Sequence, residues 1–279
     1  MADRYLLETS AVDGYLLEDG SGVLLLESGI SLRETGGWGD GTTSVSRNVP
    51  TGTTTGDIML LFVGCKPFDA TIVTPSGWTK LDAGSGTNGT TASGVDTGSV
   101  QWATFYREWQ SGDTTTTVTI TGGNVGLCTT QSFKNAGANP WAIPVAAKGS
   151  DTSSDTTFSL AMDADPSITA NDMLMHYAVV AGDGLTIFTP TLTATSATIG
   201  TVTDNGGGFT ALGDDLGGSC SYALCTAGSA TAAPVCGWTL SVAQTGGGSI
   251  VRLREVIVAG APILNLLNMA PYLTADTRS

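Results

Sequence analysis

The stretch TGDIMLLFV, residues 55–63, decides the fold of this chain. Gly56 and Asp57 are turn-forming residues, and the six apolar residues that follow them have the length of a strand buried on both faces. Residues 117–121 alternate between threonine and apolar side chains, which is the pattern of a half-buried strand. Residues 99–109, rich in aromatics, and residues 127–133 are expected to form two more strands. This succession predicts a β-sandwich.

The same succession returns in the second half of the chain. Asn171 and Asp172 precede another apolar run, and strand-like segments follow it at residues 218–227, 237–242 and 249–256. This alignment matches Val251 with Cys128 and places Phe209 where the first copy has Trp78. The repetition predicts two tandem modules of the β-sandwich, jelly-roll-like type.

The predicted organisation has five parts. They are an N-terminal arm (1–36), module 1 (37–137), a connector (138–144), module 2 (145–260) and a C-terminal tail (261–279). Each module has a usual domain size. Prolines 140 and 144 are expected to hold the connector in an extended path.

Composition favours an all-β chain and argues against nucleic-acid binding. Charged residues make up 13% of the 279 residues, against about 25% in an average soluble protein, and there are 38 glycines. Threonine, valine and aromatics suit strands, while residues that favour long helices, apart from alanine, are scarce. The net charge of −14 repels phosphate backbones, and no cluster of lysine and arginine opposes it.

Cysteine usage and hydropathy indicate a protein made in the cytoplasm. The five cysteines are irregularly spaced, so buried thiols are expected at Cys65 and Cys128, with one disulfide among Cys220, Cys225 and Cys236 as the alternative. The N-terminus lacks the pattern of a signal peptide. No apolar run approaches the ~20 residues of a membrane helix, so no membrane association is expected.

The arm contains three copies of a short apolar strand that ends in glutamate: YLLE, YLLE and VLLLE. Turn-forming residues separate them, which predicts a three-stranded meander. Such a small meander cannot cover its own leucines, so docking on another subunit is expected, and packing on its own sandwich is the alternative. The candidate partner-binding residues are Tyr5, Leu6, Leu7, Tyr15, Leu16, Leu17, Val23, Leu24, Leu25 and Leu26.

No enzymatic motif, cofactor site or metal site is predicted. The single histidine, His176, lies within an apolar run, and a core histidine with one hydrogen bond is expected there. Asp163, Asp165, Asp214 and Asp215 are interpreted as turn residues rather than as a catalytic pair of carboxylates for glycoside cleavage. Two alternatives remain open: calcium bound by Asp204, Asn205, Asp214 and Asp215, and sugar bound by exposed tryptophans among Trp38, Trp78, Trp109 and Trp141.

The modules resemble sandwich domains that recur in structural proteins of tailed bacteriophages. Four segments carry the resemblance: the Gly56-Asp57 turn with its apolar strand, the turn at residues 75–79, the aromatic strand at residues 102–109 and the threonine-rich strand at residues 112–121. The arm is similar to N-terminal segments of phage virion proteins. Module 2 lacks the Pro-x-Gly-Trp turn.

This resemblance implies a non-enzymatic virion protein, most simply a head decoration or cement protein attached through its arm. The implied partners are the major capsid protein or other virion proteins, and three-fold positions of a capsid lattice would suit a homotrimer. The alternative is a tail fibre, spike or baseplate component that binds a host-surface glycan.

Overall fold

The computed structural model describes residues 29–86, 99–112, 114–135, 139–182, 187–210 and 216–256. Every regular element in these ranges is a β-strand, which confirms the all-β prediction. This part of the chain holds no helix that could cross a bilayer. The strands are β1 (Ser31–Gly41), β2 (Ser44–Asn48), β3 (Ile58–Lys66), β4 (Thr71–Ile72), β5 (Thr79–Gly86), β6 (Val100–Glu108), β7 (Thr115–Thr121), β8 (Val125–Lys134), β9 (Val145–Ala161), β10 (Met173–Val180), β11 (Ile187–Thr193), β12 (Ala197–Ile199), β13 (Thr203–Thr210), β14 (Leu216–Gly228) and β15 (Val235–Leu253).

Repeat 1, strands β1 to β8, consists of two sheets packed face to face. The inner sheet has the order β1-β8-β3-β6-β5, and the outer sheet has the order β2-β7-β4. Val118 and Ile120 of β7 point inward against Met59 and Leu61 of β3, as the alternation in β7 predicts. All pairings within these sheets are antiparallel.

Repeat 2, strands β9 to β15, has pairings that correspond to those of repeat 1. Two of its strands, β9 and β15, are long, and each runs through both the inner and the outer layer of the repeat. The last part of β15, residues 246–253, pairs with β10, whereas its first part, residues 235–240, pairs with β11. Strand β9 follows β15 along both parts. One strand thus replaces the pair β7 and β8 of repeat 1, and β9 replaces β1 and β2.

The strand pairings align the two repeats residue by residue. Ile58, which follows Asp57, pairs with Glu108 and Phe133. Met173, which follows Asp172, pairs in the same way with Leu224 and Leu253. This correspondence of pairings supports an internal repetition of the chain.

Two details of the alignment predicted from the sequence are wrong. Cys128 pairs with Val63, and Gly248 pairs with Ala178 at the same distance along β10, so Gly248 rather than Val251 is its counterpart. Thr79 and Thr203 occupy equivalent positions beside Tyr106 and Tyr222, so the counterpart of Trp78 is Val202 rather than Phe209. Both errors arise because loops of different length separate strands that are aligned in space.

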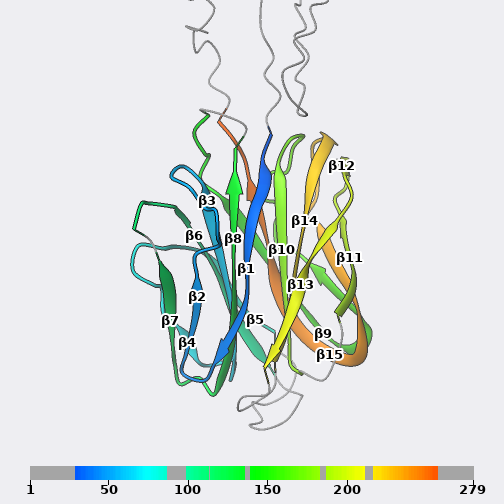
Figure 1. The fold of residues 1–279 in the computed structure, drawn as a ribbon. Coiled ribbons are helices and arrows are strands. Elements are labelled where there is room, and N and C mark those ends of the chain that lie inside the picture. Colours follow the sequence, from blue (N-terminus) through cyan, green and yellow to red (C-terminus); the bar gives the residue numbers. More distant parts are fainter. Residues whose placement is uncertain are drawn as a thin grey trace, which may run out of the picture.

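The inner sheets of the two repeats pack against each other, which gives a body of four β layers (Figure 1). Alternate residues of β3 therefore face different cores: Ile58, Leu60 and Phe62 face repeat 2, and Met59 and Leu61 face the outer sheet. An antiparallel sheet usually has one solvated face. Here both faces are covered, which explains why the apolar run at residues 58–63 is uninterrupted.

The contacts between the inner sheets follow a local two-fold symmetry. Phe62 and Tyr177 occupy equivalent positions, each five residues after its aspartate, and their rings stack with centroids 4.8 Å apart. Glycines allow this close approach: a Cβ at Gly247 would lie 2.1 Å from the Trp102 ring, and one at Gly218 would lie 3.1 Å from Leu127. By the strand pairings, Trp102 corresponds to Gly218 and Leu127 to Gly247. The two contacts are therefore symmetry equivalents.

Polar groups also cross between the inner sheets. Tyr177 Oη donates a hydrogen bond of 2.6 Å to Gln131 Oε1, and the hydroxyls of Thr104 and Ser249 lie 2.8 Å apart. Lys66 Nζ donates to the carbonyl of Ala181 in the other repeat. A core shared in this way joins the two predicted modules into one body.

One predicted boundary needs correction. The predicted arm extends to residue 36, but β1 begins at Ser31 and pairs along β8 from Lys134 to Gly126. The segment assigned to the arm therefore includes half of an inner-sheet strand. The predicted connector lies between β8, which ends at Lys134, and β9, which begins at Val145.

Candidate functional site

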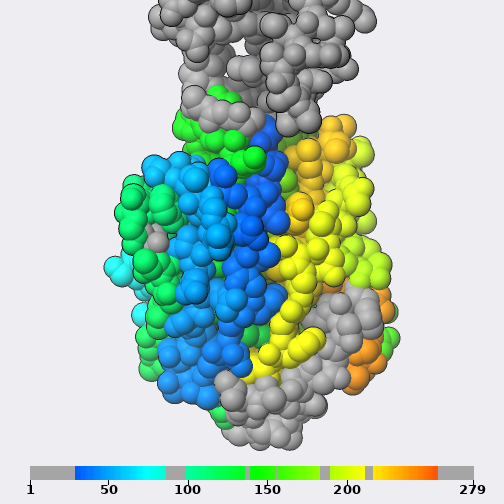
Figure 2. Space-filling view, in the orientation of Figure 1, coloured from blue at the N-terminus to red at the C-terminus, as the bar shows by residue number. Residues whose placement is uncertain are grey.

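All ten predicted partner-binding residues of the arm, from Tyr5 to Leu26, lie outside the described residues. The structure instead locates the end of the body from which they continue. Ser31 pairs with Lys134, and the connector runs beside the last described residues, with Val256 N donating to the Pro140 carbonyl at 2.8 Å. The first and last described residues therefore lie at the same end of the body, at the top of Figure 1 and Figure 2. This end is called the proximal end.

A buried aspartate organises the proximal end of repeat 1. Asp57 Oδ2 accepts hydrogen bonds from Thr54 N at 2.8 Å and from Thr54 Oγ1 at 3.4 Å, which closes the turn before β3. Gly56 adopts a φ of 95°, a conformation that favours glycine. Arg33 of β1 places its guanidinium against the same carboxylate, with Nη2 2.9 Å from Oδ1.

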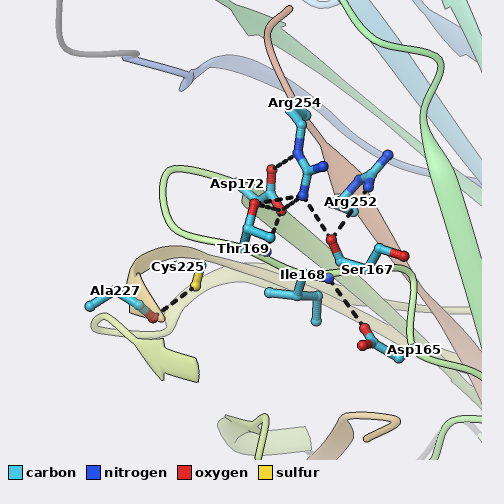
Figure 3. Close-up of polar contacts among 9 residues, drawn as sticks. All are labelled: Asp165, Ser167, Ile168, Thr169, Asp172, Cys225, Ala227, Arg252 and Arg254. Carbon is cyan, nitrogen blue, oxygen red and sulfur yellow. Dashed lines mark hydrogen bonds and ion pairs between the residues drawn. The ribbon is translucent and has the colours of Figure 1, made fainter. Parts of the chain in front are cut away.

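The same arrangement recurs in repeat 2, with the arginine supplied by a different strand (Figure 3). Asp172 Oδ2 accepts from Thr169 N at 2.7 Å and from Thr169 Oγ1 at 3.3 Å. Arg254, just after β15, bonds both carboxylate oxygens at 2.6 Å, and its Nη2 also donates to the Ser167 carbonyl at 2.7 Å. The hydrogen bonds to Asp172 raise the pKa of Arg254 above its ordinary value.

Beside the first of these clusters, the proximal end carries a polar cleft of about 380 Å³. Its lining includes side chains of both charges: the basic residues Arg33 and Lys134 and the acidic residues Asp57 and Glu108. Trp141 of the connector forms one wall and donates from Nε1 to the Gly56 carbonyl at 2.8 Å. The cleft therefore offers hydrogen-bond donors and acceptors to a chain segment that passes along this end.

Apolar side chains are exposed near the cleft. Ile143 of the connector is 74% exposed and Val256 is 42% exposed, and their segments run next to each other. Single exposed apolar residues are normal on a protein surface. Their position places apolar groups next to the polar cleft at the proximal end.

His176 is a core residue, as predicted, but it lacks the predicted hydrogen bond. The side chain is fully buried, and its ring lies 5.0 Å from that of Trp238. Neither ring nitrogen has a hydrogen-bond partner among the described residues. Burial lowers the pKa of His176 to about 3, so the imidazole is neutral at physiological pH.

All five cysteines are buried free thiols, so the alternative of a disulfide among the last three is wrong. Burial raises the pKa of Cys65 and of Cys128 to about 12, which keeps both sulfurs protonated. A protonated buried thiol is a poor nucleophile and metal ligand. These side chains serve as small apolar core residues.

Trp78 and Trp102 fill cores, and the other tryptophans considered for sugar binding are half-buried. Trp78 is 6% exposed and Trp102 is 1% exposed. Trp38 of β1 is half-buried against β13, where a Cβ at Gly208 would lie 2.5 Å from it. Trp109 and Trp141 are also half-buried rather than fully exposed.

Among the acidic residues considered as ligands or as a catalytic pair, Asp165 and Asp204 serve turns, whereas Asp163, also interpreted as a turn residue, accepts a hydrogen bond from Lys148 N, 15 residues away in the chain. Asp165 Oδ1 accepts from Ile168 N at 3.2 Å, and Asp204 Oδ1 accepts from Gly206 N at 3.0 Å. Asp214 and Asp215 lie outside the described residues. Within the ranges that the structure describes, no group of His, Cys, Asp and Glu side chains could hold a metal ion.

A second cavity, of about 560 Å³, was not expected from the sequence. It lies where β5 of repeat 1 faces β9 of repeat 2, and its walls include Lys148, Asp163 and Gln101. Its lining residues come from two separate stretches of the chain, residues 83–102 and residues 148–163. No local motif marks them, so only the packing of the two repeats brings them together.

Comparisons with protein-family models, with curated proteins and with solved structures find no match for this chain. The resemblance to virion proteins therefore stays a prediction.

Proposed function

We propose that this chain is a non-enzymatic structural protein of a tailed-phage virion, which decorates the head and is attached through its proximal end. The observation that carries the proposal is that the described body begins and ends at that end. Residues 1–28, which contain the YLLE, YLLE and VLLLE segments, precede this end of the body in the chain, and residues 257–279 follow it. Attachment there leaves the opposite end of the four-layer body projecting outward.

Three further features support this proposal. The residues of the two repeats resemble phage sandwich domains, as set out above. The exposed Ile143 and Val256 and the polar cleft beside them offer contacts next to the arm. The net charge of −14 suits a partner surface with basic residues. The proposed partner is the major capsid protein or another virion protein, with a homotrimer at three-fold positions of the lattice.

Immunogold labelling of intact virions with antibodies raised against residues 29–256 tests the proposal. Label distributed over the head supports a decorating protein. Label on the tail alone would instead support the alternative, a fibre, spike or baseplate component. Purified virions whose proteins do not include this chain would contradict both assignments.

A further inference from the structure

The two edges of the packed inner sheets are closed by different side chains at equivalent positions. Trp38 pairs with Thr129, which pairs with Phe62. Lys148 pairs with Ser249, which pairs with Tyr177. Because Phe62 and Tyr177 are counterparts, Trp38 and Lys148 are counterparts as well.

At the first edge, the Trp38 indole fills the space between the repeats. It lies over β13 and β14 so closely that a Cβ at Gly208 of β13 or at Gly218 of β14 would come within 2.6 Å of it. In the space-filling view the surfaces of β1 and β13 run side by side along this seam (Figure 2). The first edge is therefore sealed.

At the second edge, lysine replaces the indole and the cavity of about 560 Å³ lies in the corresponding region. Gly84, which lines it, is the counterpart of Gly208 beneath Trp38. The volume falls within the range of roughly 300–1,000 Å³ that is usual for small-molecule sites, which often lie at junctions between domains. The comparison with the sealed edge indicates that the cavity is a local departure from the symmetric packing.

The polar groups of the cavity are held in place. Lys148 Nζ donates to the Ala83 carbonyl at 3.1 Å and lies 3.7 Å from Asp82 Oδ1. Asp163 Oδ1 accepts from Lys148 N at 3.1 Å. Burial raises the pKa of Asp82, and the neighbouring Asp163 charge adds to this, while the ammonium of Lys148 opposes it. Positioned groups of this kind can bind a ligand without first being ordered.

The chemistry of the lining selects the class of ligand. Carboxylate and amide oxygens accept hydrogen bonds, whereas lysine, amide and serine groups donate them, so hydroxyl groups can be satisfied from several sides. Asp82 and Asp163 against one lysine disfavour an anion. Trp102 lines the cavity and is 1% exposed, so its ring offers little surface for stacking. The lining therefore favours hydroxyl-rich, uncharged molecules over aromatic or acidic ones.

We propose that the cavity between β5 and β9 binds a neutral sugar unit through Lys148, Asp163 and Gln101. This proposal rests on the packing of the two repeats and does not depend on attachment to a virion. The site differs from the sugar platform considered from the sequence, because hydrogen-bonding groups rather than exposed tryptophans form it.

Saturation-transfer NMR with the full chain tests the proposal, using neutral oligosaccharides that end in glucose, galactose, mannose or N-acetylglucosamine, with sialyllactose for comparison. The variant Lys148→Trp places an indole at the second edge, at the position equivalent to that of Trp38 at the first edge. The matched control, Lys80→Trp, makes the same change at an exposed position of β5 that does not line the cavity. Gln101→Ala removes one hydrogen-bonding group without filling the cavity.

We expect at least one neutral sugar to bind with a Kd of about 10 mM or tighter. Lys148→Trp should weaken binding about tenfold or more, Gln101→Ala should weaken it severalfold, and Lys80→Trp should leave it unchanged. Absence of binding by every neutral probe, a preference for sialyllactose, or equal binding by Lys148→Trp would overturn the proposal. If Lys148→Trp does not fold, Gln101→Ala and Asp163→Asn decide the outcome in its place.

Discussion

Phe62 and Tyr177 occupy the same position in the two repeats and stack on each other, with their ring planes 2° apart. A residue that meets its own counterpart lies on or near the symmetry axis, as in the interface of a two-fold dimer. The inner sheets thus pack as two copies of one subunit would, within a single chain. The hydroxyl of Tyr177, which Phe62 lacks, is where the symmetry is broken.

Tyr177→Phe is expected to destabilise the protein by about 1–2 kcal/mol, because Gln131 Oε1 loses its buried donor. At the symmetry-equivalent positions, Phe62 of repeat 1 takes the place of Tyr177 and Val251 of repeat 2 takes the place of Gln131, and both residues are apolar. Adding Gln131→Val to Tyr177→Phe should therefore bring stability back to within about 1 kcal/mol of the original. Denaturant unfolding of the three variants measures this. A double variant as unstable as the sum of the single ones would contradict the assigned hydrogen bond.

Asp172→Ala should destabilise the protein by about 2–3 kcal/mol, since it leaves Thr169 N and the guanidinium of Arg254 without their partner. The solvent exposure of Arg254 keeps the loss below that of a fully buried pair. Asp57→Ala should have a similar effect, because its contacts are equivalent. Asp165→Ala, which removes one turn hydrogen bond and no bonded arginine, is the control, with an expected loss of about 1 kcal/mol. Equal losses at Asp165 and Asp172 would refute the role of the arginine.

His176 should make the protein less stable in acid. Its pKa in the folded state is about 3, below the ordinary 6.5, so the unfolded chain takes up the proton first as pH falls. The contribution of the neutral imidazole to the free energy of unfolding is complete above pH 6.5. It is lost progressively as the pH falls toward 3, by up to about 1.4 kcal/mol per pH unit. His176→Phe removes this contribution, so the stability difference between the two proteins should change with pH across that window. A difference that stays constant from pH 7 to pH 4 would show that the imidazole is not buried.

The five cysteines should react with a thiol reagent such as Ellman's reagent only after unfolding. Each sulfur is buried in the native state, and burial keeps the thiols protonated. All five should react once the protein is denatured without reductant. Rapid reaction in the native protein, or fewer than five reactive thiols after denaturation, would contradict the described core.

Sequence alone predicts the strands whose pattern is set by burial. Strand β3 was evident because both of its faces are covered and its residues are apolar without interruption. Strand β7 was evident because one face is solvated. The shared turn at Asp57 and Asp172 was visible as well, and the strand pairings that follow the two turns correspond.

Strands that are held by neighbours rather than by their own composition were missed. Strand β1 (SLRETGGWGDG) is half-buried along most of its length and has no alternation, so the predicted end of the arm was placed inside it. Strand β13 (TDNGGGFT) was not among the expected strands, yet one of its glycines makes room for Trp38. The partners of Asp57 and Asp172 were equally hidden, because Arg33 and Arg254 reach them from other strands. The cavity beside Lys148 depends on how the repeats pack, which no local pattern encodes.

The most direct test of the proposed function is binding to purified heads that have been stripped of accessory proteins. The full chain is compared with residues 29–279, a deletion that spares β1, and with a full chain carrying Leu7→Asp, Leu17→Asp and Leu25→Asp. The account predicts that only the unmodified chain sediments with the heads, while all three proteins unfold with the same denaturant midpoint. Equal binding by all three, or no binding by the folded unmodified chain, would contradict attachment to the head through the arm.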